Sequence, residues 1–246
     1  MAEPIVIARD LSVGYGERVV LHDLAFEVPR GTVFAILGGS GSGKSTLLRA
    51  LIGLDRPLAG EILVEGVPPA EVSGAPRFGV LFQSAALFGS MTVAENTSLP
   101  LRHWTNLDAE AIDTIVRAKL RLVGLEGFEN HLPAEISGGM RKRAGIARAF
   151  ALDPPLIFLD EPSAGLDPIS SAELDELIRT LNRALGMTTV IVTHELASIF
   201  SIARDCILVD RDVGGIVARG NPAELRDNSD DARVRDFLNR RPRTAA

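Results

Sequence analysis

The sequence is poor in cysteine and has no long apolar stretch. Its 246 residues contain one cysteine, Cys206, so no disulfide can form within the chain and we expect a reducing compartment. No segment approaches the roughly 18 uncharged apolar residues of a membrane-spanning helix. Residues 1–10 also lack the basic start and apolar core of a secretory signal. These absences predict a soluble, cytoplasmic chain that reaches a membrane only through a partner protein.

Positive charge is also in deficit. Lys and Arg total 26 against 32 Asp and Glu, a net charge of −6, which disfavours nucleic-acid binding because phosphate neutralisation needs a basic surface. Hydrophobic residues are 46% and charged residues 24%, as in ordinary globular proteins. A chain of this length can bury one large core, and no repeat or linker interrupts it. We therefore predict a single domain over residues 1–246.

Short apolar runs alternate with helical patterns along the chain. The first 30 residues predict strands at 5–7, 19–21 and 24–28, with Gly14, Tyr15 and Gly16 as the turn between the first two. Helices are predicted from Lys44, ending near Gly53, and over 168–185, with Asp167 as N-cap and Gly186 at the end. Buried strands are predicted at 33–37, 80–82, 156–159, 189–192 and 207–209.

This alternation of strands and helices indicates an α/β fold with a mostly parallel sheet covered on both faces. Residues 94–152 interrupt the alternation with continuous helical patterning. We interpret them as an inserted helical subdomain.

A glycine-rich loop follows the predicted strand at 33–37 and opens a helix. Its glycines let main-chain N–H groups curl around phosphate oxygens, and the helix N-terminus attracts the same anion. In such a loop Lys44 would reach the β- and γ-phosphates, and the Ser45 hydroxyl would ligate Mg²⁺. The loop reads Gly38, Gly39, Ser40, Gly41, Ser42, Gly43, Lys44 and Ser45, followed by Thr46. It predicts a nucleotide-phosphate site.

Polar residues end two of the predicted strands. Asp160 and Glu161 follow the strand at 156–159, and neighbouring side chains of a strand point in different directions, so the two need not share a role. One carboxylate can reach Mg²⁺ while the other polarises a water. His194 follows the strand at 189–192. A lone strand-end histidine is more often structural, although ligands bind at this edge of α/β sheets, so both interpretations stay open.

A second glycine turn, Ser137, Gly138 and Gly139, precedes a helix-like stretch. Ser137 can cap that helix, and the glycines leave its first N–H groups open to an anion. An ordinary loop-to-helix turn explains the pattern equally well. The basic run at 141–143 is either a solvated face or a surface for acidic neighbours.

These motifs resemble, in order and spacing, the ATP-binding subunits of ABC transporters over residues 5–225. Residues 38–46 are similar to the Walker A loop, although Gly39 stands where proline is commoner. Tyr15 resembles the aromatic residue that stacks on adenine, and Gln83 resembles the Q-loop glutamine. Residues 137–139 resemble the signature motif, and residues 163–167 resemble the D-loop. Asp160 and Glu161 resemble the Walker B aspartate and the catalytic glutamate, and His194 resembles the switch histidine.

The resemblance implies a P-loop ATPase with an N-terminal antiparallel β subdomain, the helical insert at 94–152 and a C-terminal tail at 226–246. It implies a homodimer in which each chain's 137–139 turn closes on the ATP of the other. Catalysis would depend on Glu161, His194, Lys44 and Gln83, and Mg²⁺ on Ser45, Gln83 and Asp160.

Less specific sequence features resemble those of the Mce-associated, Mla-type lipid transport ATPases. Met140 replaces the usual signature glutamine and is followed by Arg141, Lys142 and Arg143, and the segments 81–88, 91–96 and 231–238 are similar to theirs. The resemblance implies lipid transport at the cytoplasmic face of the inner membrane, through a separate permease, an Mce-type extracytoplasmic lipid-binding protein and a small accessory subunit. The alternatives are an amino-acid or other small-solute importer, or a soluble ABC ATPase without a transport role.

Two segments of the chain allow more than one interpretation of their surface. As in the family it resembles, the segment after Gln83, residues 84–101, is a candidate dock for permease helices. Within it, Phe88, Met91 and Val93 either contact the permease or belong to the core. The tail is basic and has a short apolar face formed by Val234, Phe237 and Leu238. It can pack on its own body, bind a partner subunit or approach anionic lipid.

Overall fold

A computed structural model describes residues 3–71 and 74–241. The chain divides into two compact units, the first made of Met1–Val72 and Thr188–Ala246 and the second of Ser73–Met187. Whether these units act as one domain stays a prediction. Among the described residues, no helix has the length and apolar character needed to cross a membrane.

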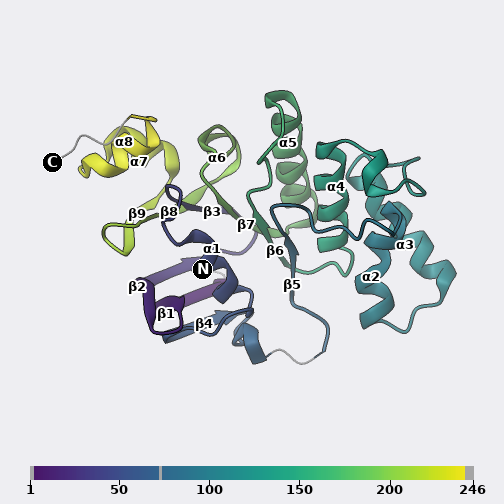
Figure 1. Cartoon of the computed structure of the whole chain (residues 1–246), viewed down its shortest axis with the longest axis horizontal. Helices are drawn as coiled ribbons and strands as arrows, with labels where there is room; N and C mark the ends of the chain where they lie inside the picture. Colours follow the sequence, from purple (N-terminus) through teal and green to yellow (C-terminus); the bar gives the residue numbers. More distant parts are fainter. Residues whose placement is uncertain (1–2, 72–73, 242–246) are drawn as a thin grey trace. The chain divides into compact units, whose positions relative to one another are not determined.

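The first unit contains a three-stranded antiparallel sheet in the order β2 (Arg18–Val28), β1 (Val6–Tyr15) and β4 (Ala59–Val64) (Figure 1). The predicted strands at 19–21 and 24–28 are one continuous strand, because the chain passes the polar pair His22 and Asp23 through irregular pairing, with Asp23 at φ +52°. The predicted turn was also misplaced. Tyr15 is still paired, with Arg18, so the turn lies at residues 16–17.

A second sheet in the first unit carries the candidate site. β3 (Val33–Leu37) is buried along its whole length and pairs in parallel with β7 (Thr188–Thr193) and β8 (Asp205–Asp210), while β9 (Gly215–Gly220) is antiparallel to β8. The predicted strands at 33–37, 189–192 and 207–209 are confirmed. Helix α1 (Lys44–Leu51) follows β3 and ends before Gly53, whose φ is +74°, also as predicted.

The C-terminal tail packs on its own unit. After α6 (Leu196–Ile202), helices α7 (Pro222–Asn228) and α8 (Ala232–Leu238) lie against each other, and Val234 and Leu238 are buried. Beyond α8, Arg240 Nη2 lies 3.0 Å from Glu195 Oε1. The tail's apolar face therefore serves intrachain packing. The predicted tail extends to residue 246, and residues 242–246 lie outside the described range.

The second unit pairs β5 (Phe78–Leu81) in parallel with β6 (Leu156–Asp160) and contains α2 (Val93–Trp104), α3 (Ala109–Leu122), α4 (Gly138–Ala149) and α5 (Pro168–Leu185) (Figure 1). The helical pattern at 94–152 corresponds to α2, α3 and α4. Both ends of α5 are as predicted: the Asp167 carboxylate accepts from the Ser170 N–H at 3.0 Å, and Gly186 has φ +64°.

Candidate functional site

The loop between β3 and α1 presents main-chain N–H groups. It begins at Gly38, directly after β3, and ends at Gly43, the N-cap of α1. Gly43 has φ +94° and offers no side-chain cap, and the first turn of α1 has no acidic residue. The helix itself therefore leaves its N-terminal N–H groups for a ligand. A helix start of this kind attracts phosphate.

Steric and conformational requirements explain most of the glycines in this loop. A Cβ on Gly38 would lie 2.6 Å from the Val209 carbonyl oxygen, and one on Gly43 would lie 2.8 Å from a side chain of β2. Gly41 has φ +72°, which disfavours other residues. A Cβ on Gly39 would meet nothing within 4 Å. Position 39 therefore has room for the proline that is commoner there.

Lys44 and Ser42 place polar side-chain atoms in the same loop. Lys44 is 8% exposed, and its Nζ donates to the carbonyl oxygens of Gly38 at 2.8 Å and Gly39 at 3.0 Å. The Ser42 hydroxyl is buried and has no hydrogen-bond partner among the described residues. A cation and an open hydroxyl beside the N-terminus of α1 fit a bound phosphate chain.

A cavity of about 470 Å³ opens from this loop, a size typical of small-molecule sites. Tyr15, at the end of β1, is 54% exposed, and its hydroxyl accepts a hydrogen bond from Thr46 Oγ1 at 2.8 Å. An exposed aromatic ring therefore stands beside the start of α1. The lining residues are Tyr15, Arg18, Val20, residues 41–46 and Arg211.

Arg18 and Arg211 are candidates that the sequence interpretation missed, because neither belongs to a motif. Arg18 pairs with Tyr15 in the β1–β2 hairpin, and Arg211 lies in the turn between β8 and β9. A Cβ on Gly41 would lie 4.0 Å from Arg211 Nη1, so this guanidinium is close to the glycine-rich loop of residues 38–46, called the phosphate loop below. Neither arginine forms an ion pair with another described residue. The cavity thus has two cations without an ion-pair partner in the described part of the chain.

His194 lies at the same sheet edge as the phosphate loop. Leu37 pairs with Thr193 across the parallel β3 and β7, so Gly38 and His194 each directly follow one member of this pair. His194 is exposed. The first unit therefore places Tyr15 at the cavity of residues 41–46, and His194 at the sheet edge where residues 38–46 begin.

The second unit brings Gln83 and the two carboxylates to another strand end. Leu81 of β5 pairs with Leu159 of β6, and Gln83 and Glu161 each lie two residues beyond that pair. Asp160 is the last residue of β6, whereas Glu161 has φ +44° and leaves the strand. The chain turns between the two carboxylates, which is consistent with separate roles.

The second glycine turn is the N-terminus of α4. The Ser137 hydroxyl accepts a hydrogen bond from the Met140 N–H at 3.2 Å, so the predicted cap is confirmed. A Cβ on Gly138 or Gly139 would have neighbours no closer than 3.6 and 3.7 Å, which are ordinary contacts, and neither glycine has positive φ. The chain's own packing therefore does not require two glycines here. Their missing side chains suit the approach of something from outside the chain.

The basic run after this turn is not a solvated face, and that interpretation was wrong. Lys142 is 5% exposed, and its Nζ donates to the carbonyl oxygens of Gln83 at 2.6 Å and Glu161 at 2.9 Å. Arg141 donates to the Ile136 carbonyl at 2.7 Å. Arg143 forms an ion pair with Glu173 at 3.0 Å. The run is mainly a source of donors for loop carbonyls.

Burial lowers the pKa of Lys142 below the usual lysine value, because desolvation disfavours the ammonium form. The nearby charges of Asp160 and Glu161 act in the opposite direction and raise it. Burial therefore disfavours the charged form of Lys142, and the two carboxylates partly compensate for this effect.

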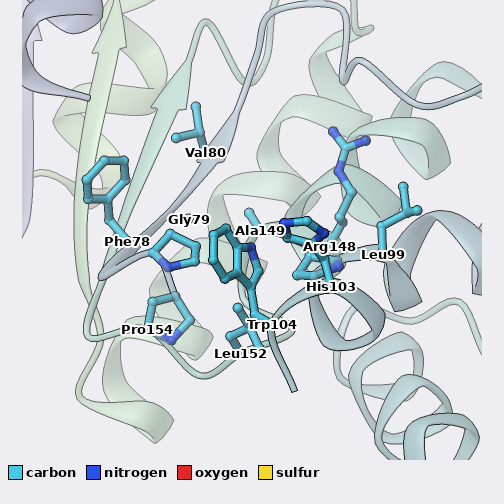
Figure 2. A pocket seen from close by; sticks show the side chains of 12 residues that line it. Phe78, Gly79, Val80, Leu99, His103, Trp104, Arg148, Ala149, Leu152 and Pro154 are labelled. Atoms are coloured by element: carbon cyan, nitrogen blue, oxygen red, sulfur yellow. The ribbon is translucent and has the colours of Figure 1, made fainter. Parts of the chain in front are cut away.

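A separate cavity of about 490 Å³ lies in the second unit, beside α2 (Figure 2). Trp104 is 42% exposed there, and its ring meets the His103 ring edge-on at 4.5 Å between centroids. In the candidate docking segment, Val93 is fully buried, whereas Phe88 is 56% exposed. Val93 is therefore core, and Phe88 is surface. The cavity is lined by Pro76, residues 78–80, Leu99, Pro100, His103, Trp104, Arg148, Ala149, Leu152 and Pro154.

The described residues contain no group of three or more His, Cys, Asp or Glu placed to hold a metal ion. A metal here would need other oxygens, such as those of a nucleotide's phosphates. Mg²⁺ usually binds in this way, with one or two carboxylates plus substrate phosphates.

A family model described as ABC transporter matches residues 21–164. The chain is 44% identical to the intermembrane phospholipid transport system ATP-binding protein MlaF of Escherichia coli K12, over 95% of this chain and 88% of that protein. It is also 44% identical to the probable ribonucleotide transport ATP-binding protein mkl of Mycobacterium leprae, over 95% of this chain and 68% of that protein. It spans 65% of the mkl protein of Mycobacterium tuberculosis H37Rv.

Solved structures resemble the fold. The cbiO1 protein of Clostridium perfringens, part of an ABC transporter complex, superposes with a TM-score of 0.83 at 28% identity, over 97% of each chain. A dimeric ATP-binding cassette in a post-hydrolysis state, bound to ADP and Pi, gives a TM-score of 0.77 at 29% identity, over 88% of this chain and 98% of that chain. The expected fold class is confirmed.

Proposed function

This chain belongs to the ATP-binding subunits of ABC transporters, which are ATPases that couple hydrolysis to transport, and we propose that it powers phospholipid transport. The observation that carries the proposal is 44% identity to MlaF over 88% of that protein's length. The catalytic residues expected of an active ATPase are also present. In this proposal the chain sits at the cytoplasmic face of the inner membrane, with a permease, an Mce-type lipid-binding protein and a small accessory subunit.

ATP binding is assigned to the cavity of the first unit. Residues 38–46 hold the phosphates, Lys44 neutralises the β- and γ-phosphates, and the exposed Tyr15 ring stacks on adenine. Arg18 and Arg211 add positive charge at the sides of the cavity. Mg²⁺, when bound, would offset phosphate charge, with the Ser45 hydroxyl, Asp160 and Gln83 as its protein ligands.

The signature turn is assigned to the partner protomer's nucleotide. The N-terminus of α4 has a serine cap, two glycines without an intrachain requirement and no acidic residue in its first turn. These features suit contact with a γ-phosphate presented by a second copy of the chain. The solved dimeric cassette bound to ADP and Pi supports a dimer as the working state.

Hydrolysis is assigned to Glu161, which orients or deprotonates the attacking water. His194, at the edge shared with the phosphate loop, stabilises the γ-phosphate and its developing charge. Gln83 lies level with Glu161 at the end of the neighbouring strand and senses the state of the site. Bound ATP then favours the closed dimer, and the loss of ATP by hydrolysis reopens the dimer.

The cavity beside α2 is assigned to a helix of the permease. Its walls are apolar except for His103 and Arg148, and Trp104 lies partly exposed at its side (Figure 2). Arg148 also donates to the carbonyls of Ala85 and Ala86, at 2.8 and 2.7 Å. Movement of a docked helix can therefore reach the segment that follows Gln83.

Cargo is where the relatives differ. MlaF is named for phospholipid transport and mkl for ribonucleotide transport, at the same 44% identity. We favour lipid because the chain spans more of MlaF, 88% against 68% of mkl. A ribonucleotide or another small solute, such as an amino acid, is the second candidate.

The test uses the chain copurified with its membrane subunits and reconstituted into phospholipid vesicles. We expect ATP to drive transfer of a fluorescent phospholipid between vesicles and the lipid-binding subunit, and Glu161→Gln to abolish transfer while retaining ATP. Wild-type complex that moves labelled ribonucleotide or amino acid but no lipid would overturn the cargo. Undiminished ATPase activity in Glu161→Gln would overturn the assignment of the base.

A further inference from the structure

Lys142 joins two loops that meet at the ends of β5 and β6. Its Nζ donates to the carbonyl oxygens of Gln83 and Glu161, which lie 59 and 19 residues away in the sequence. Each of these two residues lies two positions beyond the paired Leu81 and Leu159. A single side chain thus fixes the main chain of the Q-loop glutamine relative to that of the expected catalytic base.

Packing alone does not explain a lysine at this place. Lys142 is 5% exposed, and burying an ammonium group is unfavourable unless it is paired and hydrogen-bonded. An apolar side chain of similar length would fill the same space without this cost. The lysine supplies what an apolar residue lacks, which is charge-assisted donation to two carbonyls.

The backbone of Glu161 needs support from its surroundings. Its φ of +44° lies in the left-handed region, which is uncommon for a residue other than glycine and persists where neighbouring groups hold it. The bond from Lys142 acts on the Glu161 carbonyl, directly next to the strained Cα. This backbone conformation sets the direction in which the Glu161 side chain leaves the main chain, so the bond also influences where the carboxylate can lie.

Lys142 belongs to the helix that starts with the signature turn. Ser137 caps α4, and Lys142 lies five residues further along the same helix. A contact at the N-terminus of α4 therefore acts through about one and a half turns of helix on the Lys142 side chain.

We propose that Lys142 is a positioning residue that makes the placement of the Glu161 carboxylate depend on both the signature helix and the loop of Gln83. The inference rests on the proposed role of Glu161. It means that a partner protomer at α4 and a permease acting on the segment after Gln83 adjust the same catalytic group. Lys142 itself does not touch the nucleotide in this scheme.

The experiment compares Lys142→Met with Lys142→Arg and with a matched control, Lys119→Met, in the full chain bound to its membrane subunits. Lys119 is also a buried lysine of the second unit, 6% exposed and ion-paired with Asp153. Its removal reports the general effect of losing a buried ammonium. Steady-state ATPase rates, binding of a fluorescent ATP analogue and thermal unfolding are measured for each variant.

We expect Lys142→Met to lower kcat by roughly tenfold or more, with KM for ATP and analogue binding changed less than about twofold, because the effect is on positioning. Lys142→Arg keeps charge and donors and should recover part of kcat. Lys119→Met should lower the unfolding temperature without a comparable loss of kcat. If Lys142→Met is too unstable to purify, Lys142→Gln, which retains a donor, replaces it.

Equal kcat in Lys142→Met and Lys119→Met would overturn the inference, as would a loss confined to KM. Glu161→Gln measured in parallel distinguishes failure of the positioning role from failure of the proposed base. If Glu161→Gln is inactive and Lys142→Met fully active, only the positioning role fails. If Glu161→Gln retains activity, the proposed base is wrong.

Discussion

The Thr46 hydroxyl donates a hydrogen bond of 2.8 Å to the Tyr15 hydroxyl, joining the first turn of α1 to the end of β1. The two residues are 31 positions apart, and the bond places the aromatic ring at the edge of the phosphate-loop cavity. Thr46 is 5% exposed, whereas Tyr15 is 54% exposed. The ring is therefore anchored at its hydroxyl and open to a ligand along its face.

Tyr15→Ala should weaken ATP binding by roughly tenfold, since stacking of a base on an aromatic ring contributes about 1–3 kcal/mol. Tyr15→Phe keeps the ring and loses only the bond to Thr46, so we expect less than a threefold change, about 0.6 kcal/mol. Titration with a fluorescent ATP analogue measures both. Equal losses in the two variants would show that the hydroxyl, and not the ring, determines affinity.

Arg211→Ala should reduce ATP affinity by roughly 5- to 20-fold at low salt, because a charge-assisted contact with phosphate is lost. The loss should shrink as salt rises, since the site is open to solvent. Arg219→Ala is the control: it removes the same charge from β9, where Arg219 bonds the Glu27 carbonyl at 3.2 Å. Equal affinity in the two variants would exclude Arg211 from the site.

Ser137→Arg should abolish hydrolysis while leaving nucleotide binding within about twofold, because a large cation blocks the closing surface and the chain's own phosphate loop is intact. Thr114→Arg, on an exposed position of α3, is the control. The decisive measurement mixes Ser137→Arg with Lys44→Ala. One intact composite site should form in the mixed dimer, so partial recovery of activity is expected, and its complete absence would contradict a shared site.

Trp104→Glu should prevent copurification with the permease, because it places a charge in the apolar cavity beside α2. ATP binding by the isolated variant should be unchanged. Leu122→Glu provides the control, since Leu122 is 48% exposed at the end of α3, compared with 42% for Trp104. A Trp104→Glu chain that still recovers the permease in normal yield would move the docking surface elsewhere.

Cys206 should resist thiol reagents at pH 8 until the chain unfolds. Burial, with a smaller effect of Asp205, raises the pKa of the thiol to about 12, and its Sγ donates to the Gly220 carbonyl at 3.2 Å. The folded pKa lies above the unfolded value, so the neutral thiol favours folding below about pH 8.5 and this contribution is lost as the pH rises towards 12. The difference in the free energy of unfolding in urea between wild type and Cys206→Ala should become smaller as the pH increases over that range. Rapid labelling of native protein would contradict this prediction.

Local patterns determined much of this protein. Asp167, Pro168 and Gly186 set the limits of α5 because caps act within a turn of the helix, and Ser137 does the same for the start of α4. The phosphate loop was also predictable from the sequence, since its glycines, Lys44 and Ser45 lie in one short segment. The limits of the strands were harder to predict. Strand β2 continues through His22 and Asp23, because pairing with β1 on both sides of this polar pair outweighs the interruption.

Tertiary structure decided what depends on residues far apart in the chain. Nothing in the sequence distinguishes Lys142 from Arg141 and Arg143, yet folding buries its ammonium between carbonyls 59 and 19 residues away. Arg211 belongs to no motif and reaches the phosphate loop because β8 pairs with β3. The family motifs, the helix caps and the phosphate-binding loop are each carried by neighbouring residues, and for that reason they were predictable from the sequence alone. Only the fold shows which buried cation joins the loops of Gln83 and Glu161, because such contacts form when distant segments pack.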